Sequence, residues 1–241
     1  EVAYSVGTNV QKDSLFVSDL PPERRAIVID ELLNRAENSQ VSSIDRGDYI
    51  LAIAELVEGL DKSKRRKYYD RAFALGNTPI VNEIETVSSH PLGGFIHQGF
   101  SSPIGQQAEG LYLAARLADC DDQRTDVKKR IYELFGQDES SSYRLVRALQ
   151  RLGESDFLND DIGFLAGQDW GARSLAAVLW VKHPNPAYVG YRLAHDPDVR
   201  VRKSFAGALA DCEETPEHME VRELLRQDPH YSVRKSLQKK K

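Results

Sequence analysis

The chain has few of the residues from which metal and thiol sites are built. Its 241 residues include two cysteines, Cys120 and Cys212, and six histidines. The cysteines show no Cys-x-x-Cys spacing, which predicts free thiols in a reducing compartment such as the cytoplasm. His90 and His97 are the closest histidine pair, and no further Cys or His accompanies them. The sequence therefore predicts no metal site.

Signatures of nucleotide and hydrolase chemistry are also absent. The chain has no GxxxxGK phosphate loop, no GxGxxG opening a helix and no GxSxG nucleophile turn. The paired acids 121–122 and 160–161 fall at expected helix boundaries, where helix capping accounts for them. We therefore expect no catalytic residues and no bound cofactor.

Long apolar runs and an excess of positive charge are missing as well. No apolar run approaches the ~20 residues of a membrane-spanning helix, so no membrane partner is expected. The 32 Lys/Arg against 37 Asp/Glu give a net charge of −5, which makes nucleic acid the less favoured partner. From Arg222 onward, however, seven basic residues face two acidic ones. This basic end either binds phosphate or is a solvated surface, and we favour the second interpretation.

The most informative feature that is present is a repeat. Residues 196–205 (DPDVRVRKSF) recur as 228–237 (DPHYSVRKSL), with six identical positions at a spacing of 32 residues. Weaker copies at 29-residue spacing lie upstream. Together the copies align four arginines: Arg144, Arg173, Arg202 and Arg234. A period of this length indicates an array of repeats, each too small to bury its apolar face alone.

Each repeat is expected to fold as helix, turn, helix, with the motif opening the second helix. Pro186 and Pro216 suit the first turn of first helices. Asp169 and Asp198 stand where a carboxylate caps the amides of a second helix. Met219 is the only methionine, so the chain lacks an initiator and is expected to be a segment of a larger multidomain polypeptide.

This pattern resembles the HEAT-repeat family, in particular its short bacterial form. In that form the second helix opens with an aspartate, a valine-arginine pair, an alanine pair and a leucine. The matching residues are Asp198, Val201, Arg202, Ala206 and Leu209. The resemblance extends over residues 124–241 and implies an all-α fold, a right-handed α–α superhelix of antiparallel helix pairs. It implies no activity, and Phe205 departs from it where a small residue is expected.

The arginine column has two interpretations. We expect a structural ladder of Arg144, Arg173, Arg202, Arg234, Asp169 and Asp198. Each arginine would bond an aspartate or a carbonyl of the neighbouring repeat and fix the stacking. The alternative is that the arginines line a surface for an acidic partner.

The N-terminal part, residues 1–103, reads as divergent helices without strand-like alternation, ahead of regular repeats at 104–241. The glycine-rich segment 91–103 also carries Phe95, Ile96 and Phe100. Either these side chains plug a junction between the two parts, or they are exposed and anchor a protein or peptide partner.

The favoured function is a non-catalytic protein-interaction scaffold, or a docking or sensor segment. The alternative comes from the resemblance, because some HEAT-like proteins excise alkylated bases from DNA and others attach bilin chromophores. Trp170, Trp180 and Asp169 supply the residue types that base excision uses. The acidic net charge weakens this alternative.

Overall fold

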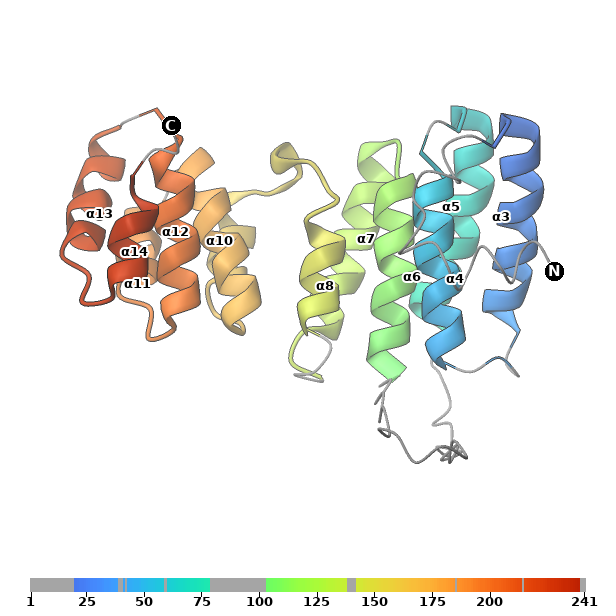
Figure 1. Ribbon diagram of the computed structural model, residues 1–241, viewed down its shortest axis with the longest axis horizontal. Coiled ribbons are helices and arrows are strands. Elements are labelled where there is room, and N and C mark those ends of the chain that lie inside the picture. Colours follow the sequence, from blue (N-terminus) through green and yellow to red (C-terminus); the bar gives the residue numbers. More distant parts are fainter. Residues whose placement is uncertain are drawn as a thin grey trace. The chain divides into compact units, whose positions relative to one another are not determined.

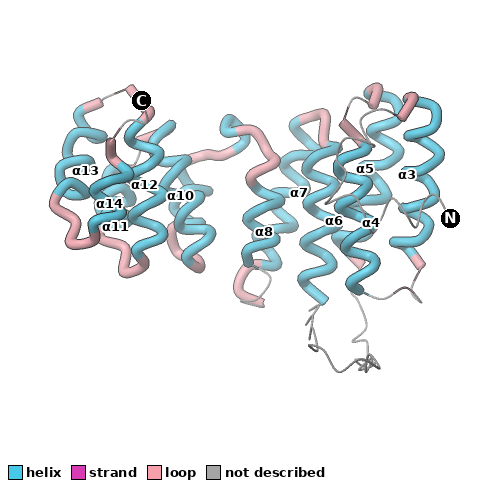
Figure 2. Tube along the Cα trace, in the orientation of Figure 1, coloured by secondary structure: helices cyan, strands magenta, loops and turns pink. Residues whose placement is uncertain are grey.

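The computed structural model describes residues 20–38, 41, 43–58, 60–78, 103–137, 142–184, 186–213 and 215–238. Within these ranges the regular structure is helical and contains no strand, which confirms the predicted all-α class (Figure 2). No helix within these ranges is both long and apolar enough to cross a bilayer. Phe95, Ile96 and Phe100 of the glycine-rich segment lie outside the described residues.

The chain divides into two compact units, Glu1–Arg151 and Leu152–Lys241. The boundary predicted at 103/104 falls inside the first unit. It lies in α6 (Pro103–Leu117), which packs directly against the described helix before it, α5 (Lys62–Asn77).

Within its described residues, the first unit holds three helix pairs. Its described helices are α3 (Pro22–Glu37), α4 (Ser43–Leu56), α5, α6, α7 (Asp121–Leu134) and α8 (Ser142–Leu149). The second helices α4, α6 and α8 pack successively against one another. Side-chain hydrogen bonds link the first helices α3, α5 and α7. Tyr69 Oη of α5, for example, donates to the carbonyl oxygen of Gln123 in α7 at 3.1 Å.

Two glycines let α5 and α6 approach closely. A Cβ atom placed on Gly110 would lie 2.6 Å from the backbone nitrogen of Gly76 and 2.9 Å from the carbonyl carbon of Leu75. Backbone atoms cannot rotate away from such a contact as a side chain can. The spacing of α5 and α6 therefore depends on the missing side chain of Gly110.

Among its described residues, the second unit repeats the arrangement with three more pairs (Figure 1). The first helices are α9 (Asn159–Leu165), α11 (Ala187–Ala194) and α13 (Pro216–Arg226). The second helices are α10 (Trp170–Lys182), α12 (Val199–Ala210) and α14 (Tyr231–Ser236). Helix α10 packs on α12, α12 packs on α14, and α11 packs on α13, so first and second helices form separate layers.

Trp180 fills the centre of this unit and is fully buried. Its ring meets Phe205 edge to face, with centroids 5.5 Å apart, and its Nε1 donates to the Pro186 carbonyl oxygen at 3.1 Å. A Cβ on Gly190 would lie 2.5 Å from the Trp180 ring. Phe205, the departure from the family pattern, is thus a core residue that packs against the tryptophan of the preceding second helix.

Candidate functional site

The arginine column of the second unit lies near the start of its second helices. Arg173, Arg202 and Arg234 are the fourth residues of α10, α12 and α14. The residues before these helices are Asp169, Asp198 and His230, and each accepts a hydrogen bond from a backbone N–H of the first turn. The caps fix where each helix begins, so the three arginines leave their helices at the same point of the repeat.

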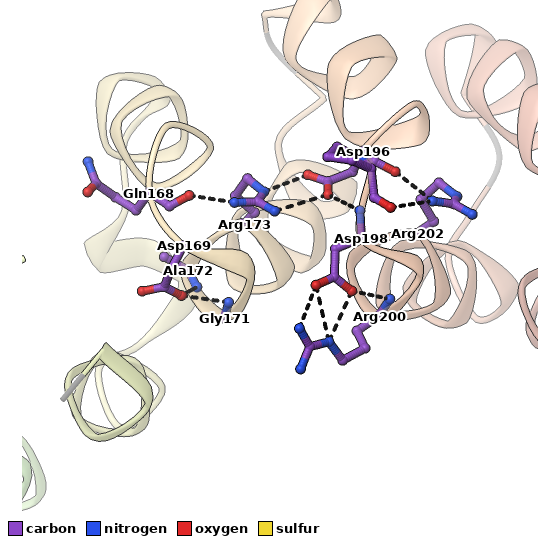
Figure 3. Close-up of polar contacts among 10 residues, drawn as sticks. Gln168, Asp169, Gly171, Ala172, Arg173, Asp196, Asp198, Arg200 and Arg202 are labelled. Atoms are coloured by element: carbon purple, nitrogen blue, oxygen red, sulfur yellow. Dashed lines mark hydrogen bonds and ion pairs between the residues drawn. The ribbon is translucent and has the colours of Figure 1, made fainter. Parts of the chain in front are cut away.

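Arg173 connects its helix pair to the next one along the chain (Figure 3). Its Nε donates to Asp196 Oδ2 at 2.6 Å, and its Nη2 donates to Oδ1 at 3.2 Å. Asp196 lies in the turn between α11 and α12. Arg173 Nη1 also donates to the Gln168 carbonyl oxygen, 2.7 Å away, in the turn before its own helix. One guanidinium group therefore joins the turns of two consecutive helix pairs.

Arg202 makes the same contacts one repeat later. Its Nε donates to Asp228 Oδ2 at 2.6 Å, and its Nη1 donates to the Asp196 carbonyl oxygen at 2.6 Å. The Asp228 side chain is 3% exposed. Burial raises the pKa of this carboxyl. Hydrogen bonds from Arg202 and from the backbone N–H of His230 outweigh that effect and hold the pKa below its ordinary value.

Asp196 and Asp228 each serve two arginines. The carboxylate accepts from the arginine of the preceding second helix, and the carbonyl oxygen accepts from the arginine of the following one. Each carboxylate also accepts from a backbone N–H two residues ahead, Asp198 N at 2.8 Å and His230 N at 2.7 Å. We call this chain of bonds the Arg–Asp ladder: Arg173, Asp196, Arg202, Asp228 and Arg234.

The ladder ends at Arg234. Its Nη1 donates to the carbonyl oxygens of Asp228 at 2.5 Å and Pro229 at 2.9 Å. These are the turn contacts that Arg202 makes with its own loop. Within the described part of the chain, no carboxylate takes the place that Asp228 has for Arg202.

Arg144, the fourth member of the predicted column, lies in the first unit and has a different partner. Its Nη1 is 3.3 Å from Glu109 Oε1 on α6, and its side chain is 41% exposed. Burial raises the pKa of Glu109, and Arg144 only partly offsets this. The ion pair thus reaches back to the preceding second helix, whereas Arg173 and Arg202 reach forward to a turn.

The two predicted aspartates act within their own repeats. Asp169 accepts from the backbone N–H groups of Gly171 and Ala172 at 2.7 and 3.1 Å. Asp198 accepts from Arg200 N at 2.8 Å and also binds the Arg200 side chain, which lowers the pKa of Asp198 to about 2. The acidic members of the ladder are instead Asp196 and Asp228. Their signal in the sequence was the Asp-Pro pair at the start of both copies of the ten-residue motif.

The first unit contains a further arginine of this kind that the internal repeat did not indicate. Arg46 is the fourth residue of α4 and is 8% exposed. Its Nη2 donates to the carbonyl oxygens of Asn38 and Val41, both at 3.3 Å, in the turn before its helix. Arg173, Arg202 and Arg234 make the equivalent turn contact. The sequence repeat did not reveal Arg46, because Gly47 and Asp48 follow it where the motif has Lys203 and Ser204.

The residue types considered for base excision do not converge. Asp169 is occupied by helix capping, and Trp180 is fully buried in the core. Trp170 is 38% exposed and lies on the same helix ten residues earlier, ~15 Å away along the axis. Among the described residues, no three His, Cys, Asp or Glu side chains are grouped in a way that could hold a metal ion.

Comparisons of the chain with protein families, curated proteins and solved structures found no match in any of the three. The architecture and the contacts described above therefore carry the functional argument.

Proposed function

We propose that this chain is a non-catalytic protein-interaction scaffold, built as a HEAT-like stack of antiparallel helix pairs that winds into a superhelix. The supporting observation is the use of its regularly spaced charges. Arg173, Arg202, Asp196 and Asp228 bond one another between consecutive repeats and do not converge on a pocket. Such nearest-neighbour bonds are how a repeat protein keeps a long surface in a fixed shape.

The two-layer packing supports the same proposal. In each unit the described second helices pack on one another in chain order and form a layer of their own. A row of parallel helices presents many side chains at regular intervals to an extended partner. Repeat proteins characteristically bind their partners on such a surface. The proposed partner is a protein or a peptide.

Photo-crosslinking in the source cells tests the proposal. Benzoylphenylalanine would replace Tyr188 of α11 in one experiment and Lys203 of α12 in another, because both side chains are exposed. We expect a discrete adduct with one protein, which mass spectrometry would identify. That protein, once purified, should bind the full chain. Absence of an adduct from both positions would contradict the scaffold proposal. Release of bases from alkylated duplex DNA by the purified chain would support the enzymatic alternative.

A further inference from the structure

Charge is segregated between the two helix layers of the second unit. The second helices α10, α12 and α14 contain seven Lys/Arg and no Asp/Glu, whereas the first helices α9, α11 and α13 contain three Lys/Arg and five Asp/Glu. The unit as a whole has 13 basic and 14 acidic residues, a balance of −1. The positive charge of the second helices is therefore local.

The ladder does not use all of this positive charge. Lys203 and Lys235 follow the ladder arginines at the same position of the duplicated Val-Arg-Lys-Ser segment, and both side chains are exposed. The structure gives neither lysine a carboxylate partner among the residues that it describes. Because α12 packs directly on α14, the two ammonium groups belong to one layer of neighbouring helices.

Exposed aromatic side chains lie at the start of two of these helices. Trp170 and Tyr231 open α10 and α14, and Tyr231 is 66% exposed. The first and fifth residues of a helix share a face, so Tyr231 and Lys235 are neighbours on α14. Arg200 and Lys203 are three residues apart on α12, a spacing that also places them on one face. We call Trp170, Arg200, Lys203, Tyr231 and Lys235 the second-helix face.

Two contacts hold the Arg200 side chain of this face. Its guanidinium carbon lies 3.8 Å from the centre of the Trp170 ring, while Nε and Nη2 bond the Asp198 carboxylate. The Arg200 side chain is nevertheless 56% exposed, and the described residues leave its Nη1 without a hydrogen bond. A stacked and clamped guanidinium loses little conformational entropy when it binds a further carboxylate.

From this geometry we infer that the second-helix face binds an acidic protein segment carrying an aromatic or large apolar side chain. The inference rests on the proposed scaffold function and names the site and the chemistry of its partner. Carboxylates of the segment pair with Lys203, Lys235 and the free edge of Arg200, and its apolar side chain packs on Trp170 or Tyr231. Nucleic acid fits less well, because its affinity comes from many phosphate contacts and this face offers two unpaired lysines.

Binding of a fluorescein-labelled, glutamate-rich peptide with one central phenylalanine, measured by fluorescence anisotropy on the full chain, tests the inference. A peptide with lysine in place of each glutamate is the reversed-charge probe. Lys203→Glu with Lys235→Glu is the test variant. Lys62→Glu with Lys129→Glu is its control, because it changes charge equally at exposed lysines on α5 and α7.

We expect the acidic peptide to bind the parent chain more weakly as salt rises, because the contacts are exposed ion pairs. The test variant should lose about tenfold or more in affinity, since reversal turns attraction into like-charge repulsion. The control variant should bind like the parent, and the reversed-charge peptide should not bind. Melting curves of both variants should match the parent, because all four lysines are exposed.

Three results would overturn the inference. One is equal loss in test and control variants, which would show general charge attraction. Another is no binding of the acidic peptide to the parent chain. The third is tighter binding of a single-stranded oligothymidine probe that the test variant alone loses, which would assign the face to nucleic acid. The scaffold proposal is judged separately, because the crosslinking experiment can yield a protein partner whichever face the peptide uses.

Discussion

The two units share one design but join their helix pairs by different chemistry. In the second unit one contact recurs: an arginine at the start of a second helix binds the Asp-Pro aspartate in the turn of the next helix pair, as Arg173 binds Asp196. In the first unit each junction is unique. Arg71 of α5 binds Asp30 and Glu37 of α3, and Arg116 of α6 binds Glu55 of α4.

This difference explains why the repeat is visible in one part of the sequence and not in the other. A recurring contact needs the same residues at the same spacing, so it leaves a period in the sequence. Individual contacts leave none, even where the helices pack in the same two layers. Arg46 shows the intermediate case, because it keeps the turn contact of the ladder arginines without their neighbouring residues.

The largest loss of stability is expected in the first unit, where α5 and α6 approach closely. Gly110→Ala should destabilise the protein by about 3 kcal/mol or more, because the new Cβ would collide with the backbone of α5. Gly207→Ala in α12 is the control, since a Cβ there meets nothing within 4 Å. It should be neutral or stabilise by roughly 0.5–1 kcal/mol through helix propensity. Chemical denaturation measures both, and equal effects would show that the close approach of α5 and α6 is unimportant.

The second largest loss of stability is expected in the Arg–Asp ladder of the second unit. Arg173→Ala should reduce the free energy of unfolding by about 1–3 kcal/mol, because it leaves the buried Asp196 carboxylate without its charged partner. Arg200→Ala removes an exposed arginine that is also paired with an aspartate, and should cost under about 1 kcal/mol. Urea unfolding of both variants provides the comparison. If Arg173→Ala melts like the parent but loses partner binding, the column is an interaction surface and not a ladder.

The ladder should also weaken in acid. The pKa of Asp228 is lower in the folded chain than its ordinary value, so its contribution to stability is complete above that value. The contribution is lost as the pH falls through the lower folded-state pKa. Asp228→Asn should therefore remove part of the decrease in stability that the parent shows below about pH 4. Thermal melting at stepwise lower pH measures this, and parallel profiles for parent and variant would contradict it.

The smallest loss of stability is expected on substitution of Arg144. Its pair with Glu109 is longer than the ladder bonds, and its side chain is 41% exposed. Arg144→Ala should cost under about 1 kcal/mol, because the removed guanidinium is exposed and only weakly paired with the more buried Glu109. A loss as large as that of Arg173→Ala would remove the distinction between the two units at this position.

The fold class and most helix positions were predictable from the sequence, because they follow from local signals. Asp169 and Asp198 cap α10 and α12, and Thr215 with Pro216 starts α13, each as elementary helix chemistry requires. The signal was strongest where the motif is duplicated.

The partners within the ladder were less predictable, because they depend on which turn lies beside which helix. The sequence aligned Arg173 with Arg202 but could not show that their carboxylate partners are Asp196 and Asp228. The stacking of Arg200 on Trp170 was equally hidden, since these residues are 30 positions apart on different helices. Packing decides such contacts, and one sequence alone does not record it.

A double-mutant cycle on Arg202 and Asp228 tests the central claim most directly. These residues join consecutive helix pairs, and their other described contacts are with the neighbouring turns. The free energy of unfolding would be measured for the parent, Arg202→Ala, Asp228→Ala and the double variant. The ladder predicts a coupling energy of about 1–3 kcal/mol at neutral pH, as expected for a mostly buried, charge-assisted pair. Additive effects of the two substitutions, with no coupling, would contradict it.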